Sequence, residues 1–366
     1  MSDIHFEPFG DRVSVRYRLD GVLHEVNTLP KNSYPQVVSR IKVISKLNVA
    51  EKRLPQDGRI RVKTGNREID MRVSTLPTVF GERIVIRLLD KSAGVMSLDE
   101  LGFSPEDIEK YRRIIKRPHG IILITGPTGS GKSTTLYATL MELKSPAKNI
   151  ITIEDPVEYQ IDGISQIQVN PQINLTFASG LRSILRQDPD IIMVGEIRDF
   201  ETAEIAIHAS MTGHLVLSTL HTNDAPSAVA RLVDMGVEPF LIAASLEGVV
   251  AQRLVRKICE NCRESRKPTE WELAQIEKYS GERPEKIFYG KGCEECMGTG
   301  FRGRIAIYEI MDVDEELRSK ISRNVETYQL RNLAREKGMK TLAEDGIRKV
   351  LSGLTTVEEV LQVTQV

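Results

Sequence analysis

The sequence has no long apolar run and no excess of either charge. No stretch approaches the roughly 18 apolar residues of a transmembrane helix, and no signal peptide precedes the first alternating segment. Fifty Lys and Arg residues face 51 Asp and Glu residues, so the net charge is −1. A near-neutral chain has no general surface for nucleic acid or for membrane lipid. We therefore expect a cytosolic protein.

Cysteine is also scarce, and its four copies are paired. Cys259 and Cys262 form one C-x₂-C pair, and Cys293 and Cys296 form another after a gap of thirty residues. The gap is longer than the roughly 15–20 residues of common zinc ribbons, but two such pairs favour a closed, tetrahedral, structural Zn²⁺ site. Disulfides and free thiols are the alternatives. Neither pair lies in a basic-aromatic cluster, so we interpret this segment as an interaction or scaffolding module.

Length and composition indicate several domains. A chain of 366 residues with 40% apolar and 28% charged residues is typical of a globular protein with two or three domains. Ile4 and Phe6 already alternate with polar residues, so we expect this sequence to be part of a longer protein. The predicted parts are an N-terminal α+β module (1–92), a linker (93–104), an α/β core (105–256), a cysteine-bearing module (257–303) and a helical C-terminal subdomain (304–366).

Strands and helices alternate along the predicted core. Apolar strands are predicted at Ile121–Thr125, Ile150–Ile153, Ile191–Val194 and Leu215–Thr219. Near-continuous apolar strands of this kind indicate a parallel sheet that is covered on both faces. In the N-terminal module, the turn Asp20-Gly21 predicts a β-hairpin and Val37–Leu47 has helical spacing. The predicted fold class is α/β, with a smaller α+β module in front.

The most informative motif follows the first of these strands. The pattern G-x-x-x-x-G-K-[ST] occupies Gly126, Pro127, Thr128, Gly129, Ser130, Gly131, Lys132 and Ser133. Its glycines let backbone N–H groups surround phosphate oxygens, and the helix that follows adds partial positive charge. Lys132 would reach the β- and γ-phosphates, and the Ser133 hydroxyl would ligate Mg²⁺. Because a strand and a helix flank the motif, it predicts a nucleoside triphosphate site and not merely a glycine-rich turn.

Acidic residues follow the next two strands of the core. Glu154, Asp155 and Glu158 come after the second strand, where they would face the nucleotide in an open α/β sheet. Glu196 comes after the third strand, one residue beyond the place where a Walker B aspartate is usual. The longer glutamate side chain suits the activation of water, so Glu196 is the leading candidate and Glu158 the second. The alternatives are a turn or helix cap for the first group and a solvated charge for Glu196.

Histidines bracket the fourth strand, and arginines lie in strands of the N-terminal module. His214 and His221 flank Leu215–Thr219, which favours γ-phosphate sensing, more for His221 than for His214, over a structural hydrogen bond. Arg72 and Arg87 could stabilise the charge that develops in phosphoryl transfer. From the pattern alone, however, arginines in strands are usually solvated charges.

Taken together, these segments resemble the secretion ATPase superfamily, the hexameric RecA-like motors of type II secretion and type IV pilus assembly. The resemblance covers essentially the whole chain. Its carriers are the Walker A loop Gly126–Ser133, the acidic box Ile151–Glu158, the atypical Walker B segment Val194–Asp199 and the histidine box from Thr212 to Asp224. The four cysteines and Gly298–Arg304 resemble the zinc-bearing segment of type II secretion ATPases in particular.

The resemblance implies a RecA-like P-loop ATPase domain that binds ATP and Mg²⁺, a PAS-like N-terminal module and a Cys₄ zinc insert. Glu196 matches the catalytic glutamate, and Arg72 and Arg87 match arginines that members bring from the N-terminal module to the phosphates. It also implies a homohexamer in the cytoplasm, held at the inner membrane by secretion-platform proteins. The main anchoring domain for those partners is expected to lie outside this sequence.

The resulting hypothesis is an ATPase that converts ATP and water to ADP and phosphate and powers pseudopilus assembly and protein export in type II secretion. The nearest alternative is a type IV pilus assembly ATPase. More distant alternatives are a nucleic-acid translocase that contacts DNA through its zinc module, and a scaffold that binds ATP but hardly hydrolyses it. The near-neutral charge argues against a nucleic-acid partner.

Overall fold

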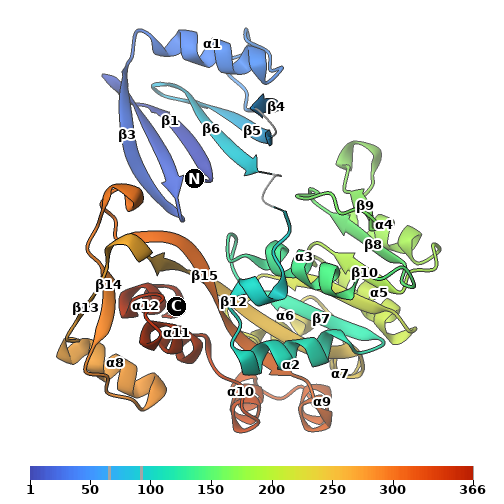
Figure 1. Ribbon diagram of the computed structural model, residues 1–366. Helices are drawn as coiled ribbons and strands as arrows, with labels where there is room; N and C mark the ends of the chain where they lie inside the picture. The colour runs from blue at the N-terminus through green and yellow to red at the C-terminus, as the bar shows by residue number, and fades with distance from the viewer. Residues whose placement is uncertain (65–66, 91–93, 366) are drawn as a thin grey trace. The chain divides into compact units, whose positions relative to one another are not determined.

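In the computed structural model the chain divides into two units, Met1–Gly94 and Val95–Val366, and the structure describes residues 1–64, 67–90 and 94–365. The first unit is an antiparallel sheet with one helix (Figure 1). The order of its strands across the sheet is β3-β2-β1-β6-β5-β4. Its elements are β1 (Asp3–Pro8), β2 (Arg12–Leu19), β3 (Val22–Pro30), α1 (Tyr34–Ile44), β4 (Gln56–Thr64), β5 (Arg67–Thr78) and β6 (Gly81–Asp90).

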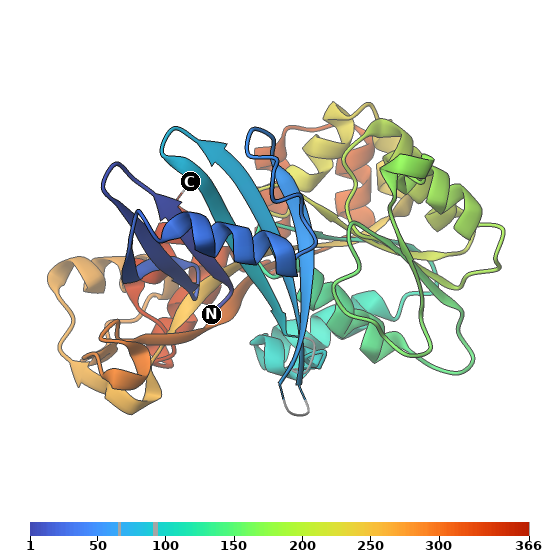
Figure 2. The same cartoon turned by 90° about the horizontal axis from the view of Figure 1, so that it is seen from above.

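One face of this first sheet is apolar and packs against α1. Val38 and Ile41 of the helix are buried with Val73, Ile84 and Ile86 of the sheet, and Figure 2 shows the helix crossing that face. Because successive side chains of a strand point to opposite faces, the polar positions between these residues lie on the other face. The predicted hairpin at Asp20-Gly21 and the predicted helix are both confirmed.

The second unit contains a seven-stranded sheet in the order β15-β12-β7-β11-β10-β8-β9. All pairs are parallel except the one between β12 and β15, which is antiparallel. The four predicted core strands are confirmed as β7, β8, β10 and β11. The strands are β7 (Gly120–Thr125), β8 (Ile150–Glu154), β9 (Ser165–Gln168), β10 (Ile191–Val194), β11 (Leu215–Leu220), β12 (Leu246–Ile258) and β15 (Phe301–Asp312).

Both faces of this sheet are buried, as the apolar strands predicted. Ile121 and Leu123 of β7 face one side, where α4 (Phe177–Ile184), α5 (Phe200–Met211), α6 (Ser227–Asp234) and α7 (Pro239–Ser245) pack. Ile122 and Ile124 face the other side, which is covered by the 3₁₀ helix η2 (Leu98–Leu101), α2 (Pro105–Ile115) and α3 (Lys132–Leu143) (Figure 1). The parallel strands therefore all end at one carboxyl edge between two helical layers.

The C-terminal part begins with a strand and is helical afterwards. Residues 301–312 form β15, whose residues Ala306, Ile307 and Ile310 are buried at the end of the sheet. This strand was not predicted, since an apolar strand cannot be distinguished from a buried helix by its pattern alone. Within the C-terminal subdomain 304–366, helices were expected from about residue 313, and this is confirmed. The helices begin afterwards and are α9 (Glu315–Ser322), α10 (Thr327–Glu336), α11 (Leu342–Leu351) and α12 (Val357–Thr364).

Two smaller features complete the fold. The cysteine-bearing segment contains β13 (Arg263–Arg266), α8 (Glu270–Ser280) and β14 (Ile287–Gly290), with β13 and β14 paired as an antiparallel ribbon. Residue 93 of the predicted linker lies outside the described residues, and the remainder includes η2. Of the helices that the structure describes, none combines the length and the apolar character of a membrane span.

The buried position of β7 leads to a stability prediction. Leu123 is 0% exposed in this interior strand. Leu123→Ala is expected to lower the free energy of unfolding by about 2–5 kcal/mol, because it leaves a cavity between the helical layers. Guanidinium denaturation followed by circular dichroism measures this change. Ile173→Ala, at a side chain 69% exposed, is the matched control, and a loss below about 1 kcal/mol in Leu123→Ala would contradict the packing.

Candidate active site and metal centre

The loop between β7 and α3 closes tightly against strand β12. Gly126 has a φ of 152° and Gly131, just before α3, has a φ of 90°. A Cβ at Gly126 would lie 2.5 Å from the backbone oxygen of Gln252, and a Cβ at Gly131 would lie 2.7 Å from Gln252 Nε2. Larger residues would clash at both positions, so backbone lines the inside of the turn. This is the geometry in which N–H groups can surround a phosphate.

Polar groups of the loop are placed to receive a phosphate chain. Lys132 Nζ donates to two carbonyl oxygens of the loop, at 2.7 and 3.1 Å. Burial lowers the pKa of Lys132 to about 8, and the nearby Glu196 carboxylate acts in the opposite direction. Ser130 Oγ is buried and, among the described residues, has no hydrogen-bond partner. A cation and an unsatisfied hydroxyl beside a helix N-terminus fit a triphosphate, and exposed Ser133 lies in the first turn of α3.

Glu196 lies just beyond β10, on the same edge of the sheet as the loop. Its Oε1 is 3.0 Å from His221 Nε2, and Arg198 Nε donates to its Oε2 at 2.8 Å. Lys132 interacts electrostatically with both Glu196 and His221. Three residues that the sequence analysis selected from separate segments are therefore neighbours at one edge, because their strands are parallel and adjacent.

Burial and a hydrogen-bonded neighbour fix the state and the place of His221. Burial, with a further contribution from Lys132, lowers the pKa of His221 below its ordinary value, so the imidazole is neutral at pH 7. In that state the ring is an uncharged neighbour of the Glu196 carboxylate. The next residue, Thr222, donates its backbone N–H to Thr125 Oγ1 at 2.8 Å. Because Thr125 ends β7, this bond ties the histidine segment to the start of the phosphate loop.

His214 lies at the other end of the same strand. Its Nδ1 is 2.9 Å from the carbonyl oxygen of Ala209 in α5. The residue precedes β11, so it is at the amino edge of the parallel sheet and away from the phosphate loop. The weaker prediction of phosphate sensing by His214 is therefore wrong, and the residue makes the structural hydrogen bond that was its alternative.

Glu154, which was predicted to bind the nucleotide or its cation, is enclosed by protein donors. Thr152 Oγ1 donates to its Oε1 at 2.5 Å, and Gln166 Nε2 donates to the same oxygen at 3.1 Å. The hydroxyl of Tyr137 in α3 donates to its Oε2. The carboxylate thus joins β8, β9 and α3, and all its hydrogen bonds here are internal.

The other two acids of this segment are more open. Asp155 is exposed and interacts electrostatically with Arg198, which places it on the side of Glu196. Glu158 is half-buried, and its backbone N–H donates to Tyr137 Oη at 3.1 Å. Asp155 therefore lies within electrostatic reach of the Glu196 cluster.

The predicted arginines of the first unit form part of a row across its sheet. Arg72 of β5 lies directly opposite Arg87 of β6, and Arg59 of β4 lies opposite Arg72. Asp3 of β1 continues the row, accepting a hydrogen bond from Arg87 Nε at 2.9 Å. The register therefore places three arginines side by side, with Arg87 paired to Asp3 at one end of the row. Arg59 was missed because strand register is not visible in the sequence.

Strand β12 contributes two further residues that the sequence analysis missed. Gln252 Oε1 accepts a hydrogen bond from Thr135 Oγ1 of α3 at 2.7 Å. Arg253 Nη1 lies 3.2 Å from the position that a Cβ of Gly126 would occupy. The only signal in the sequence is that this polar pair interrupts the apolar residues Val249–Ala251 and Leu254-Val255. Polar residues within a buried strand indicate a specific partner.

The four cysteines form the predicted cluster. Their sulfurs all lie within 4.8 Å of one another, with separations of 3.8 Å for Cys259–Cys293, 3.8 Å for Cys262–Cys296 and 3.6 Å for Cys293–Cys296. A tetrahedral Zn²⁺ with Zn–S bonds of about 2.3 Å separates its sulfurs by about 3.8 Å. A disulfide needs about 2.05 Å. The cluster is therefore consistent with a structural zinc site, and the disulfide alternative does not fit.

A phosphate loop at the carboxyl edge of a parallel sheet places the second unit in the class of P-loop ATPases. A comparison of the whole sequence with known families assigns the chain to one family within this class. The family model described as type II/IV secretion system protein matches residues 1–362, and the chain belongs to that family. The resemblance to secretion ATPases is confirmed.

Curated relatives come from both secretion and pilus systems. The type II secretion system protein E of Pseudomonas aeruginosa is 54% identical over 364 residues, which cover 100% of this chain and 72% of that protein. The type IV pilus assembly ATPase PilB of Thermus thermophilus is 54% identical over 361 residues, or 98% of this chain. The chain spans only 41% of the length of that second relative.

Solved structures agree with the fold. The pilus retraction motor PilT with bound ADP has a TM-score of 0.66 and 27% identity, with 99% of this chain and 92% of that chain covered. The ATPase DotB of Legionella pneumophila has a TM-score of 0.72 over 100% of this chain and 91% of that chain. At 22% identity, the second likeness supports the fold alone.

The lowered pKa of Lys132 predicts a pH dependence of nucleotide binding. The ammonium form attracts phosphate, so affinity is expected to be full below the pKa of about 8 and to fall as the pH rises through it, by up to about tenfold per unit. Calorimetric titration with the non-hydrolysable analogue AMP-PNP at several pH values measures this. Lys132→Arg stays charged and is expected to remove the dependence. Constant affinity in the unmodified protein would contradict the lowered pKa.

The sulfur geometry predicts about one tightly bound zinc ion per chain. Elemental analysis of the purified protein measures the metal, and a chelator is expected to lower the melting temperature of the metal-loaded form. Cys262→Ser is expected to lose most of the zinc, because three thiolates hold it less well than four. Ser265→Ala, at an exposed position of β13, is the control. Metal-free protein with two disulfides by mass spectrometry would overturn the assignment.

Proposed function

We propose that this protein is the ATP-hydrolysing motor subunit that powers pseudopilus assembly and protein export in type II secretion. The observation that carries the proposal is the contact of Glu196 with His221 beside Lys132, at a loop that only glycine can form. The full-length match to the type II secretion protein of Pseudomonas aeruginosa supports the system.

The residues of the site have distinct proposed roles. The loop from Gly126 to Ser133 binds the phosphates, with Lys132 as the cation closest to the reacting end. Glu196 accepts a proton from the attacking water, and neutral His221 holds that carboxylate in place and senses the γ-phosphate. Glu158 is the second candidate for the base. Arg72 and Arg87 stabilise the charge that develops during phosphoryl transfer.

Magnesium fits the oxygen donors at this edge. Ser133 and Asp155 are the residues that would hold it, whereas Glu154 supports them from within the sheet. When bound, Mg²⁺ neutralises charge on the phosphate oxygens. The protein side chains then orient the attacking water and hold the triphosphate in one position.

We further propose a homohexamer in the cytoplasm that is held at the inner membrane by secretion-platform proteins. The resemblance to hexameric secretion ATPases supports this assembly. In this hexamer, the cysteine-bearing segment acts as a scaffold that bound metal makes rigid. Hydrolysis changes the conformation of one subunit after another around the ring.

The second candidate is a type IV pilus assembly ATPase, because the Thermus thermophilus relative of that name is equally identical at 54%. Gene neighbourhood separates the two: secretin and pseudopilin genes favour secretion, and major pilin and retraction-motor genes favour pili. A nucleic-acid translocase would instead show salt-sensitive stimulation of its ATPase by DNA. The net charge of −1 argues against that third function.

Substitution of Glu196 tests the proposed chemistry. Glu196→Gln is expected to retain ATP binding and to lower kcat by at least about 100-fold, because an amide cannot accept the proton of the attacking water. Steady-state phosphate release and calorimetric binding measure the two effects. Glu201→Gln, an exposed acid of α5 paired with Arg182, is the matched control. Full activity in Glu196→Gln would refute the assigned role.

The same assay tests assembly. The ATPase rate per subunit is expected to rise with protein concentration as sedimentation detects hexamers, because active sites that are completed by assembly form only in the hexamer. A substantial rate that does not change with concentration would contradict this dependence. Nucleotide binding without hydrolysis at every concentration would favour the scaffold.

A further inference from the structure

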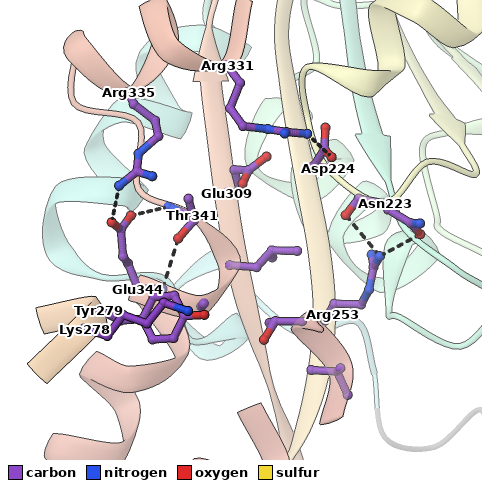
Figure 3. A pocket seen from close by; sticks show the side chains of 14 residues that line it. Asn223, Asp224, Arg253, Lys278, Tyr279, Glu309, Arg331, Arg335, Thr341 and Glu344 are labelled. Atoms are coloured by element: carbon purple, nitrogen blue, oxygen red, sulfur yellow. Dashed lines mark hydrogen bonds and ion pairs between the residues drawn. The ribbon is translucent and has the colours of Figure 1, made fainter. Parts of the chain in front are cut away.

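Arg253 is a buried charge that the proposed chemistry leaves unexplained. Its side chain is only 5% exposed in β12, where it borders a pocket of about 340 Å³ in the second unit (Figure 3). Among the described residues no carboxylate forms an ion pair with it. Burying a guanidinium without an ion pair costs free energy, so its hydrogen bonds indicate a specific structural role.

Those hydrogen bonds lead from the phosphate loop to the histidine box. Arg253 Nη2 donates to the backbone oxygen of Asn223 at 3.0 Å and to its side-chain Oδ1 at 3.1 Å. Nη1 donates to the carbonyl of Gln252 at 3.1 Å, the same oxygen that prevents a Cβ at Gly126. The guanidinium of Arg253 therefore contacts both the Gln252 carbonyl, which packs against the phosphate loop, and Asn223, which lies two residues after His221.

The segment of residues 221–225 is held at every one of its positions. His221 contacts Glu196, and Thr222 Oγ1 is 2.7 Å from Thr125 Oγ1. Asn223 is held by Arg253. The last two positions are fixed from the C-terminal part, with Arg331 Nη2 2.7 Å from Asp224 Oδ2 and Ala225 N–H donating to Glu309 Oε1 at 2.8 Å. Figure 3 shows Arg331 pointing to Asp224 and Arg253 pointing to Asn223.

The charges around the segment explain why a cation is required at this place. Glu309 is 4% exposed and lies near Asp224, and burial raises the pKa of Glu309 to about 7. Both acids attract Arg253 electrostatically. Arg331 is the partner of Asp224 on the outer side. Without Arg253, the contacts of Asp224 and Ala225 with the C-terminal part would remain, and Asn223 would lose its link to the Gln252 carbonyl beside Gly126.

We propose that Arg253 is a positioning residue for ATP hydrolysis, which holds the 221–225 segment against the phosphate loop so that His221 and Glu196 stay aligned with the reacting phosphate. This inference rests on the proposed ATPase function. It assigns Arg253 no contact with the nucleotide. Its removal therefore affects the rate of the chemical step and leaves the binding of ATP largely intact.

Three variants of the full chain test the inference. Arg253→Gln is expected to lower kcat by about 10- to 100-fold, since a small displacement of catalytic groups is enough for such a loss. At pH 7, KM and the affinity for AMP-PNP are expected to stay within about twofold. The residues of the loop are retained, and Lys132 is protonated at this pH even with the Arg253 charge, which contributes to lowering its pKa to about 8. Arg253→Lys is not expected to restore the rate, since an ammonium lacks the planar fork that reaches the Gln252 carbonyl through Nη1 and Asn223 through Nη2.

Asn223→Ala provides a milder variant that removes one acceptor at an exposed residue. It is expected to lower kcat by a few fold and to add nothing to Arg253→Gln in the double variant, because the two side chains share one interaction. Arg335→Gln is the matched control. Arg335 borders the same pocket, one helical turn from Arg331, but pairs with Glu344 at 2.7 Å, so its loss is expected to leave kcat unchanged.

Hydrogen exchange gives a readout that does not depend on hydrolysis. With AMP-PNP bound, peptides that cover residues 221–225 are expected to exchange faster in Arg253→Gln than in the unmodified protein or in Arg335→Gln. Unchanged exchange with unchanged kcat would overturn the inference, as would a loss of AMP-PNP affinity equal to the loss of rate. An unmodified protein without any hydrolysis would instead refute the proposed function, and exchange would still decide the role of Arg253.

Discussion

The close contact between the phosphate loop and β12 is the constraint on which the site depends. The backbone of Gln252 occupies the space that a Cβ of Gly126 would need, and its side chain does the same at Gly131. The loop is thus shaped by the next strand of the sheet as well as by its own sequence. Since β12 also carries Arg253, the strand that shapes the loop also reaches the histidine box. Strand β12 therefore supports both the glycine-rich loop and the segment that carries His221.

The parallel sheet explains how separate sequence segments form one site. The strands β7, β11, β10 and β8 are neighbours in that order, although the order along the chain is β7, β8, β10, β11. Each ends at the same edge, so the residues that follow them meet there. His221 follows the strand between β7 and β10, which is why it lies between Lys132 and Glu196. The amino edge of β11 carries His214, and this separates two histidines that the sequence makes look equivalent.

Local patterns predicted most of the fold and the strongest parts of the site. The strands flanking Gly126–Ser133 and the cysteine pairs are readable because their chemistry depends on short spacings. Long-range features were not readable. The register that places Arg59 beside Arg72, and the antiparallel pairing that makes 301–312 a strand, depend on partners far away in the chain. The hydrogen-bond partners of Glu154 were equally unreadable, since this residue joins Tyr137 and Gln166 from elements that the sequence does not place beside it.

The position of the cysteine cluster indicates what a bound metal would do for the fold. Cys259 directly follows β12, and Cys296 lies five residues before β15, while Ile258 and Phe301 are paired where the two strands meet. Four thiolates on one ion would join both strands at this end. Further along, β12 carries Gln252 and Arg253, and β15 carries Glu309. A metal bound there would hold together the end of the β12–β15 pair, the two strands that carry Arg253 and Glu309 and so contact the 221–225 segment.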